Sequence, residues 1–310
     1  MTFGPQSTTS DVTRGLDLSG STVVITGGSG GLGFEAARSL VAAGAAVVLL
    51  DKDAARSDAS VRRLRAQRSG ADVTSRIADL TDHDGIRATA AALLADHPVI
   101  DVLINNAGAV FGSRTVTAFG WEATLATNFL GHFVLADALR PALRGRIVNL
   151  GSGAHRRSPI VWDDPHFAHR TYVPRDAYAQ SKSAVALFTL GLEDRLCGAG
   201  VHAYTVRPGV VATGLYGDLT DEQQAAFSSR VAGGGSGMTV EQAAATTVWA
   251  ATAPELAGAG GGYLAGCTVA GTPSAPSADG AHAPWIFDRN EAGRLWRFAE
   301  RTVGEQRRAG

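Results

Sequence analysis

One glycine-rich segment constrains this chain more than any other: residues 27–33 read GGSGGLG and lie between a β-branched run and an apolar-faced run. The run TVVIT at 22–26 predicts a buried strand, and FEAARSL at 34–40 predicts a helix. Glycine permits the sharp turn between them and lets backbone N–H groups approach a pyrophosphate, which the helix N-terminus also favours. We therefore predict a nucleotide-binding turn with contacts from Gly27, Ser29, Gly30, Gly31 and Leu32.

An acidic residue ends the next predicted strand. Residues 45–50 are AAVVLL, and Asp51 follows 18 residues after Gly33. A carboxylate at this point accepts hydrogen bonds from both hydroxyls of an adenosine ribose and repels a 2′-phosphate, which favours NAD over NADP. The adjacent Lys52 attracts a 2′-phosphate, so NADP stays possible. The alternative interpretation is that both are solvated loop charges.

Strands and helices alternate along the rest of the chain. We predict further strands over 72–78, 99–104, 146–150, 201–206 and 262–264, and helices over 56–68, 82–96, 120–143, 177–197, 240–253 and 289–303. This alternation predicts an α/β fold with a doubly wound parallel sheet and helices on both faces. Ligands of such sheets bind at the carboxyl ends of the strands. The candidate cofactor residues there are Asp79, Leu80, Asn106, Ala107, Gly108, Pro208 and Gly209.

Length and composition limit the alternatives. A chain of 310 residues with 45% apolar residues and a net charge of −1 suits a globular protein in the cytoplasm, and it gives no support for a nucleic-acid partner. No apolar run reaches the length of a membrane span. Cys197 and Cys267 form neither a disulfide framework nor a metal motif, so we predict no metal. We expect a flexible tail over 1–15 and a single domain over 16–310.

Three segments are expected to lie around the site or extend beyond it. Residues 155–177 predict a long active-site loop whose aromatic residues are Trp162, Phe167 and Tyr172. Residues 214–237 predict a mobile lid, because they hold few large apolar residues and end in glycines. Residues 266–310 form a C-terminal extension. The aromatic residues of the loop favour a deep, apolar pocket and hence a hydrophobic substrate.

The candidate chemistry lies on the helix over 177–197. Tyr178 and Lys182 are four residues apart and share one face. A tyrosine has an ordinary pKa of about 10, and a neighbouring ammonium favours the phenolate and lowers that pKa. The pair therefore predicts a proton donor and acceptor for interconverting a carbonyl and an alcohol. Ser152 comes just after a strand, where its hydroxyl could hydrogen-bond the substrate oxygen; the alternative interpretation is a turn residue or a helix cap. Asn128 is polar on an otherwise apolar helix, where its amide can also satisfy buried backbone groups.

Together these motifs resemble the short-chain dehydrogenases/reductases. The resemblance covers residues 20–303 and rests on TGxxxGxG at 26–33, Asn-Asn-Ala-Gly at 105–108, Tyr-x-x-x-Lys at 178–182 and Pro-Gly at 208–209. It implies a single Rossmann-type sheet of about seven strands in the order 3-2-1-4-5-6-7. It also implies that Tyr178 is the general acid/base, that Lys182 holds the nicotinamide ribose and that Ser152 orients the carbonyl. Asn128 would hold a relay water, and Val211 and Thr213 would contact the cofactor.

A narrower resemblance is to the retinol-dehydrogenase-like branch, which includes protochlorophyllide reductases. It rests on Gly131-His132-Phe133, on Ser152-Gly-Ala-His155, on 162–182 and on 284–296. The chain departs from that branch at Asp51, where a small or neutral residue is usual, and at Arg207, where His is frequent. The first departure puts the branch's usual NADP preference in question.

The function these residues predict is NAD(P)(H)-dependent oxidoreduction of a hydrophobic alcohol and its ketone or aldehyde. A catalytically silent NAD(P)-binding sensor is the alternative from another class, and an NADP-dependent ketoreductase of secondary metabolism is an alternative within the same class. The intact set of Asn128, Ser152, Tyr178 and Lys182 disfavours the sensor, because binding alone does not require a tuned tyrosine. The family resemblance implies a homodimer or homotetramer through the helices over 120–143 and 177–197.

Overall fold

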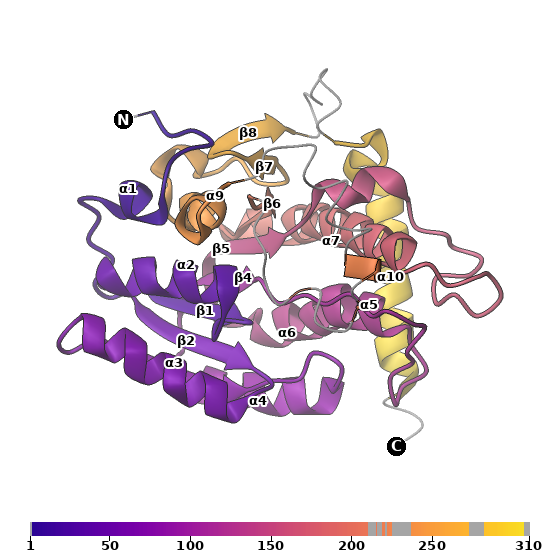
Figure 1. Cartoon of the computed structure of the whole chain (residues 1–310), viewed down its shortest axis with the longest axis horizontal. Coiled ribbons are helices and arrows are strands. Elements are labelled where there is room, and N and C mark those ends of the chain that lie inside the picture. Colours follow the sequence, from indigo (N-terminus) through magenta and orange to yellow (C-terminus); the bar gives the residue numbers. More distant parts are fainter. Residues whose placement is uncertain are drawn as a thin grey trace.

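The computed structural model describes residues 2–209, 215, 219–220, 222–224, 237–272 and 282–306. These residues build one eight-stranded sheet in the order β3-β2-β1-β4-β5-β6-β7-β8 (Figure 1). Strands β1 to β7 run parallel, and β8 pairs antiparallel with β7. The predicted doubly wound sheet is confirmed. The strands are β1 (Thr22–Thr26), β2 (Ala46–Asp51), β3 (Val73–Ile77), β4 (Ile100–Asn105), β5 (Leu143–Leu150), β6 (His202–Arg207), β7 (Tyr263–Ala265) and β8 (Thr268–Gly271).

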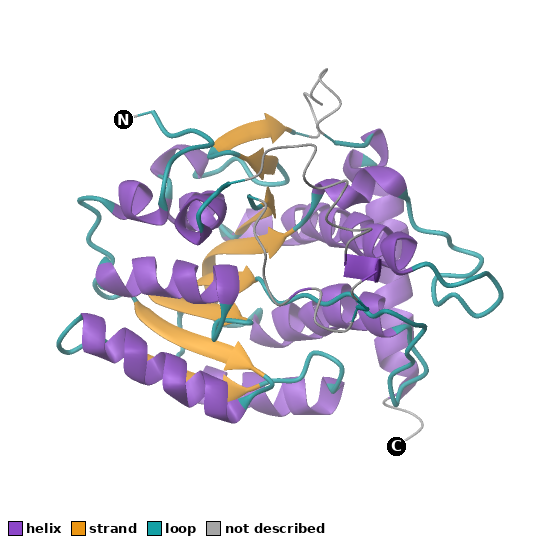
Figure 2. Cartoon of the chain, viewed as in Figure 1, coloured by secondary structure: helices purple, strands orange, loops and turns teal. Residues whose placement is uncertain are grey.

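Helices cover both faces of the sheet (Figure 2). Successive side chains of a strand point to opposite faces, so Val23 and Ile25 of β1 pack into one layer and Val24 into the other. The first layer includes α1 (Thr9–Thr13), α2 (Gly31–Ala42), α3 (Ala54–Gln67) and α9 (Val240–Thr252). The second layer includes α4 (His83–Asp96), α6 (Gly131–Leu139), α7 (Pro174–Leu196) and α10 (Arg289–Gln306).

The helix predicted over 120–143 is wrong in its bounds and its regularity. The segment consists of α5 (Ala123–Leu125), a π-helical turn η1 (Ala126–Leu130) and α6. Glu122 caps the start by accepting hydrogen bonds from the N–H groups of Thr124 and Leu125. The helix ends at Leu139 because Pro141 cannot continue it, and β5 already begins at Leu143. The π turn places Asn128 at an irregular point of the helix, a feature that is frequent at functional sites.

Two further expectations are corrected at the ends of the chain. Residues 9–13, expected within a flexible tail, form α1 with a capping box, and Thr9 and Val12 are buried against α2 and α9. The eighth strand was not predicted. It follows a tight turn in which both Gly266 and Cys267 have positive φ, as a two-residue hairpin requires.

The C-terminal helix α10 lies against α7 (Figure 1). Its Trp296 ring lies 5.0 Å from the ring of Phe133 on α6 and 6.0 Å from that of Phe188 on α7. The helix therefore covers part of the surface that α6 and α7 would otherwise expose. Within the described ranges, no helix combines the length and the apolar character needed to cross a membrane.

Candidate active site

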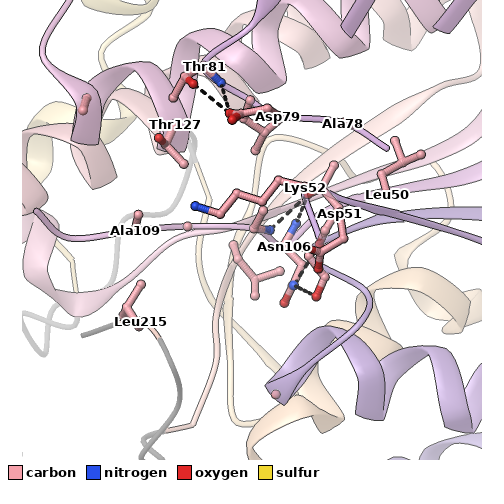
Figure 3. A pocket seen from close by; sticks show the side chains of 18 of the residues that line it. Leu50, Asp51, Lys52, Ala78, Asp79, Thr81, Asn106, Ala109, Thr127 and Leu215 are labelled. Atoms are coloured by element: carbon pink, nitrogen blue, oxygen red, sulfur yellow. Dashed lines mark hydrogen bonds between the residues drawn. The ribbon is translucent and has the colours of Figure 1, made fainter. Parts of the chain in front are cut away.

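A cavity of about 550 Å³ lies at the carboxyl ends of the central strands. Figure 3 shows Asp51, Lys52, Asp79 and Asn106 among the side chains that surround it. It sits where the strand order reverses between β1 and β4, which is the usual ligand position of a doubly wound sheet. The predicted site residues that line it are Gly27, Gly30, Gly31, Leu32, Asp51, Lys52, Asp79, Leu80, Asn106, Ala107, Gly108, Tyr178, Lys182 and Pro208.

The glycine-rich turn is built for close packing. Gly27 has φ +63°, and a Cβ on Gly33 would lie 2.3 Å from the Gly27 carbonyl oxygen, so a side chain at 33 would disrupt the turn. Helix α2 begins directly after Gly30, an N-cap residue that has no side chain to cap the first N–H groups. Gly30, Gly31 and Leu32 line the cavity. Uncapped donors at a helix N-terminus fit an anionic diphosphate, so this turn suits a dinucleotide.

Asn106 fastens the turn to the end of β4. Its Nδ2 donates hydrogen bonds to the Thr26 carbonyl at 2.9 Å and the Gly27 carbonyl at 3.2 Å. The N–H groups of Asn106 and Ala107 each donate to Thr26 Oγ1 at 3.0 Å. The loops after β1 and β4 are thereby held together by four hydrogen bonds. Thr26 itself lines the cavity and was not among the predicted site residues.

Asp51 lies at the predicted position but is already paired. Its carboxylate is buried, and Arg56 Nη2 donates to its two oxygens at 3.0 and 3.1 Å. Ser29 Oγ donates to the same carboxylate, and Arg56 Nε donates to Ser29 at 3.0 Å. Arg56 was not among the predicted site residues, although the Asp53 N-cap places it in the first turn of α3, beside the end of β2. Lys52 is exposed at the same edge of the cavity.

The segment that follows β3 also lines the cavity. Asp79 Oδ1 accepts hydrogen bonds from the Thr81 N–H at 2.8 Å and from its hydroxyl at 2.7 Å. Leu80 is buried, and its carbonyl oxygen lies 2.3 Å from the point where a Cβ on Gly131 would sit. This close approach fixes the loop after β3 against the start of α6.

Tyr178 and Lys182 come together on the first half of α7. Both are buried and line the cavity, and Lys182 Nζ lies 5.5 Å from the centre of the Tyr178 ring. The ammonium donates a hydrogen bond to the Leu150 carbonyl at the end of β5, at 2.7 Å. Burial lowers the pKa of Lys182 to about 8, because the interior disfavours the charged form. The pair thus places a cation beside a phenol at one wall of the cavity.

Asn128 contacts the residue next to Lys182, and Ser152 follows Leu150, whose carbonyl accepts from Lys182. Ser152 follows β5 and caps the 3₁₀ turn η2 (Gly153–Arg157), its hydroxyl accepting from the Ala154 N–H at 3.2 Å. The Asn128 carboxamide accepts from the Ala109 N–H at 2.8 Å. It donates to the Ala109 carbonyl at 3.1 Å and to Ser181 Oγ at 2.9 Å. Its side chain therefore holds the loop after β4 against α7. Neither residue is among the described residues that line the cavity.

Other predicted residues lie elsewhere or outside the described ranges. Gly209 packs against α9, where its N–H donates to the Ala243 carbonyl at 3.0 Å, and it does not line the cavity. Val211 and Thr213 lie outside the described residues, as do most of 214–237 and residues 273–281 and 307–310. The lining residues that sequence analysis missed include Leu50, Ala78, Ala109, Phe111, Thr115, Val116, Thr117, Ala123, Thr127, Gly151 and Leu215.

The aromatic residues of the loop over 155–177 do not line the cavity in the described part of the chain. Trp162 Nε1 donates to Glu291 of α10 at 2.7 Å, and the Phe167 ring packs edge-on against Tyr172. These contacts fasten the loop to the body of the protein, so the expected aromatic pocket wall is wrong. The apolar lining comes instead from residues such as Phe111 and Val116.

The chain is similar to known proteins over most of its length. A family model described as short chain dehydrogenase matches residues 21–224. A Streptomyces antibioticus protein named "Probable oxidoreductase" is 38% identical over 297 residues, which cover 91% of this chain and 97% of the relative. Human retinol dehydrogenase 13 is 34% identical, over 93% of this chain and 86% of its own. The Pseudomonas aeruginosa RhlG/NADP complex has a TM-score of 0.64 and 27% identity, over 80% of this chain and 95% of that one.

Proposed function

The chain belongs to the short-chain dehydrogenase/reductase family, in its retinol-dehydrogenase-like branch, and from this premise we propose that it is an NAD(P)(H)-dependent oxidoreductase of alcohols and carbonyls. The observation that carries the proposal is the pairing of buried Tyr178 with Lys182 at the cavity wall. A tyrosine beside a lysine can transfer a proton to or from a substrate oxygen. The N-terminus of α2, which lines the same cavity, suits the diphosphate of a dinucleotide.

Each residue of the site has a distinct role in this proposal. A bound nicotinamide supplies or accepts the hydride. In reduction the Tyr178 hydroxyl gives its proton to the carbonyl oxygen, and in oxidation the Tyr178 phenolate takes the proton of the alcohol. The Lys182 ammonium stabilises the phenolate and, with its remaining N–H donors, holds the nicotinamide ribose. The Ser152 hydroxyl orients the substrate oxygen, and Asn128 keeps the loop at Ala109 fixed.

NAD is the preferred cofactor in this proposal. The position of Asp51 at the end of β2 supports it, because the carboxylate lines the cavity where the adenosine ribose of a dinucleotide would lie. Lys52 and Arg56 lie at the same edge and would attract a 2′-phosphate, and the related RhlG structure is an NADP complex, so NADP is the alternative. We expect Asp51→Ser to shift the ratio of kcat/KM for NAD(H) over NADP(H) toward NADP(H). An unchanged ratio would contradict the assigned role of Asp51.

The substrate proposed is a hydrophobic alcohol or its ketone or aldehyde. Phe111, Val116 and Leu215 supply apolar side chains to the cavity that Tyr178 also lines. The direct test is a panel of hydrophobic alcohols and ketones with both cofactors, followed by the absorbance of reduced nicotinamide. Turnover of at least one pair supports the proposal. Cofactor binding without turnover on any substrate would overturn it and favour a sensor.

Self-association as a dimer or tetramer is a further proposal. The helices expected to mediate it are partly covered by α10, through the packing of Trp296 on Phe133 and Phe188. An oligomer through α6 and α7 would therefore include α10 in its interface. Light scattering after size exclusion measures the mass directly, and a monomer at all concentrations would contradict the proposal.

A further inference from the structure

The histidine of the Gly131-His132-Phe133 motif has no part in the mechanism above, yet it is buried between the cofactor loops and the catalytic helix. His132 is 3% exposed. Its Nε2 lies 2.9 Å from Thr26 Oγ1 at the end of β1, and its Nδ1 lies 3.1 Å from the carbonyl oxygen of Asn128. The imidazole thus bridges two elements that are far apart in the sequence.

The hydrogen bonds of Thr26 fix the proton on this imidazole. Thr26 Oγ1 accepts from the N–H groups of Asn106 and Ala107, both at 3.0 Å, which uses its two acceptor sites. Its hydroxyl hydrogen has two acceptors within reach, the Ile104 carbonyl at 3.5 Å and His132 Nε2 at 2.9 Å. The shorter contact is the better hydrogen bond, so Nε2 is the acceptor and carries no proton.

The other end of the ring requires the same tautomer. Because the Asn128 carbonyl can only accept, Nδ1 must carry the proton and donate to it. In the opposite tautomer, the unprotonated Nδ1 would face the Asn128 carbonyl oxygen at 3.1 Å, which places two acceptors together. The protonated Nε2 would then face the Thr26 hydroxyl hydrogen, which places two donors together. Burial, helped by the Lys182 ammonium on α7 and opposed by the hydrogen bond to the Asn128 carbonyl, lowers the pKa of His132 to about 4, so the ring is neutral at ordinary pH.

The two ends belong to the two halves of the site. Thr26 is the residue onto which the loop after β4 is clamped, and it directly precedes Gly27. Asn128 holds Ser181 Oγ at 2.9 Å through its side chain, and Ser181 Oγ donates to the Tyr178 carbonyl at 2.8 Å. Two sets of hydrogen bonds therefore meet at Asn128: its backbone carbonyl joins His132 and the loops after β1 and β4, and its side chain leads through Ser181 to the Tyr178 carbonyl.

We propose that His132 is a positioning residue, whose neutral Nδ1–H tautomer keeps the cofactor loops at the ends of β1 and β4 in register with Asn128 and the catalytic helix α7. The inference rests on the proposed oxidoreductase function. It predicts that His132 affects the rate of the chemical step more than the binding of cofactor or substrate, because His132 is not among the described residues that line the cavity.

The tautomer is measured without any turnover. In protein labelled with ¹⁵N-histidine, the signal missing from His132→Asn identifies the ring, and we expect the Nδ1–H tautomer to persist from pH 5.5 to 8.5. A signal of the Nε2–H tautomer, or protonation near pH 6.5, would overturn the inference even in a protein that turns over no substrate.

The rate is measured with matched variants. His132→Phe fills the space without either hydrogen bond, and we expect kcat to fall roughly 10- to 100-fold while cofactor Kd and substrate KM change by less than about threefold. His132→Asn keeps a donor near the Nδ1 position and should recover part of the loss. The control is His83→Phe: His83 is equally buried, its nitrogens have no hydrogen-bond partner among the described residues, and it does not line the cavity.

A double-mutant cycle tests whether the bridge is one unit. Thr26→Val removes the hydroxyl, whereas Thr26→Ser retains it. We expect Thr26→Val and His132→Phe together to cost less in kcat than the product of the two separate losses. If the two substitutions reduce kcat independently, or if His132→Phe has the kcat of the wild type, the positioning role of His132 is overturned and the proposed oxidoreductase function is not. A wild-type protein that binds cofactor but turns over nothing would overturn the proposed function and this role together.

Discussion

Replacing Lys182 by Met tests how the buried ammonium acts on Tyr178. The two groups are 5.5 Å apart, measured from Nζ to the ring centre, and both are buried. At an effective dielectric constant of about 20, unit charges at that distance interact by about 3 kcal/mol. Losing this stabilisation of the phenolate should lower kcat/KM about 100-fold at pH 7.

The pH dependence separates the charge from other effects of the substitution. Burial lowers the pKa of Lys182 to about 8, so the wild-type ammonium loses its proton as the pH rises through that value. We therefore expect wild-type kcat/KM for the oxidation of an alcohol to decline above pH 8, and Lys182→Met to lack that decline.

A matched variant controls for the lost hydrogen bond. Lys182 Nζ donates to the Leu150 carbonyl at 2.7 Å, and Met leaves that carbonyl without this donor. Lys182→Gln supplies an uncharged N–H donor of similar length, so it should be as slow as Lys182→Met if the charge is responsible. The assay is the initial rate of nicotinamide reduction at saturating cofactor. Activity within about threefold of wild type in either variant, or an unchanged decline near pH 8, would refute the reasoning.

Two other predictions concern stability. Burial lowers the pKa of His83 to about 4, so between pH 6.5 and 4 the unfolded chain binds a proton that the folded chain does not, and the folded state loses stability as the pH falls. His83→Phe should reduce that loss by up to about 1.4 kcal/mol per pH unit, measured by urea unfolding at pH 6.5 and 4.5; equal slopes would contradict it. A Cβ on Gly131 would lie 2.3 Å from the Leu80 carbonyl oxygen, so Gly131→Ala should lower the free energy of unfolding by about 1–3 kcal/mol. Gly293→Ala in α10, whose nearest neighbour is the end of the Arg297 side chain at 3.4 Å, is the control, and equal effects of the two substitutions would refute the steric argument.

Much of the fold follows from patterns that are local in the sequence. The βαβ unit around 22–51 was predicted because a β-branched run, a glycine turn and an apolar-faced helix each have a local signature. The C-terminal hairpin was not, because its turn uses Gly266 and Cys267 rather than the usual Asn-Gly pair. The break in the helix over 120–143 depends on Glu122 as a cap and on a π turn, and neither follows from hydrophobic periodicity.

In the site too, a contact within one helix was predicted, and side-chain contacts between different elements were not. Tyr178 and Lys182 share a helix face, so their spacing alone predicts that they lie together. Arg56 pairs with Asp51 across the ends of two elements, and no spacing rule identifies that contact. The aromatic residues of the loop over 155–177 were predicted to line the pocket because the loop is rich in them. Trp162 instead donates a hydrogen bond to Glu291, which is distant in the sequence, and no local pattern predicts that contact.

The central claim is that Tyr178 moves the proton that accompanies hydride transfer. The most direct measurement is the single-turnover rate of Tyr178→Phe beside wild type, on a substrate that the wild type accepts, together with the cofactor Kd of both. We predict a loss of about 10²- to 10⁴-fold in rate with the cofactor Kd within about threefold of wild type. A Tyr178→Phe variant that transfers hydride at the wild-type rate would contradict the account.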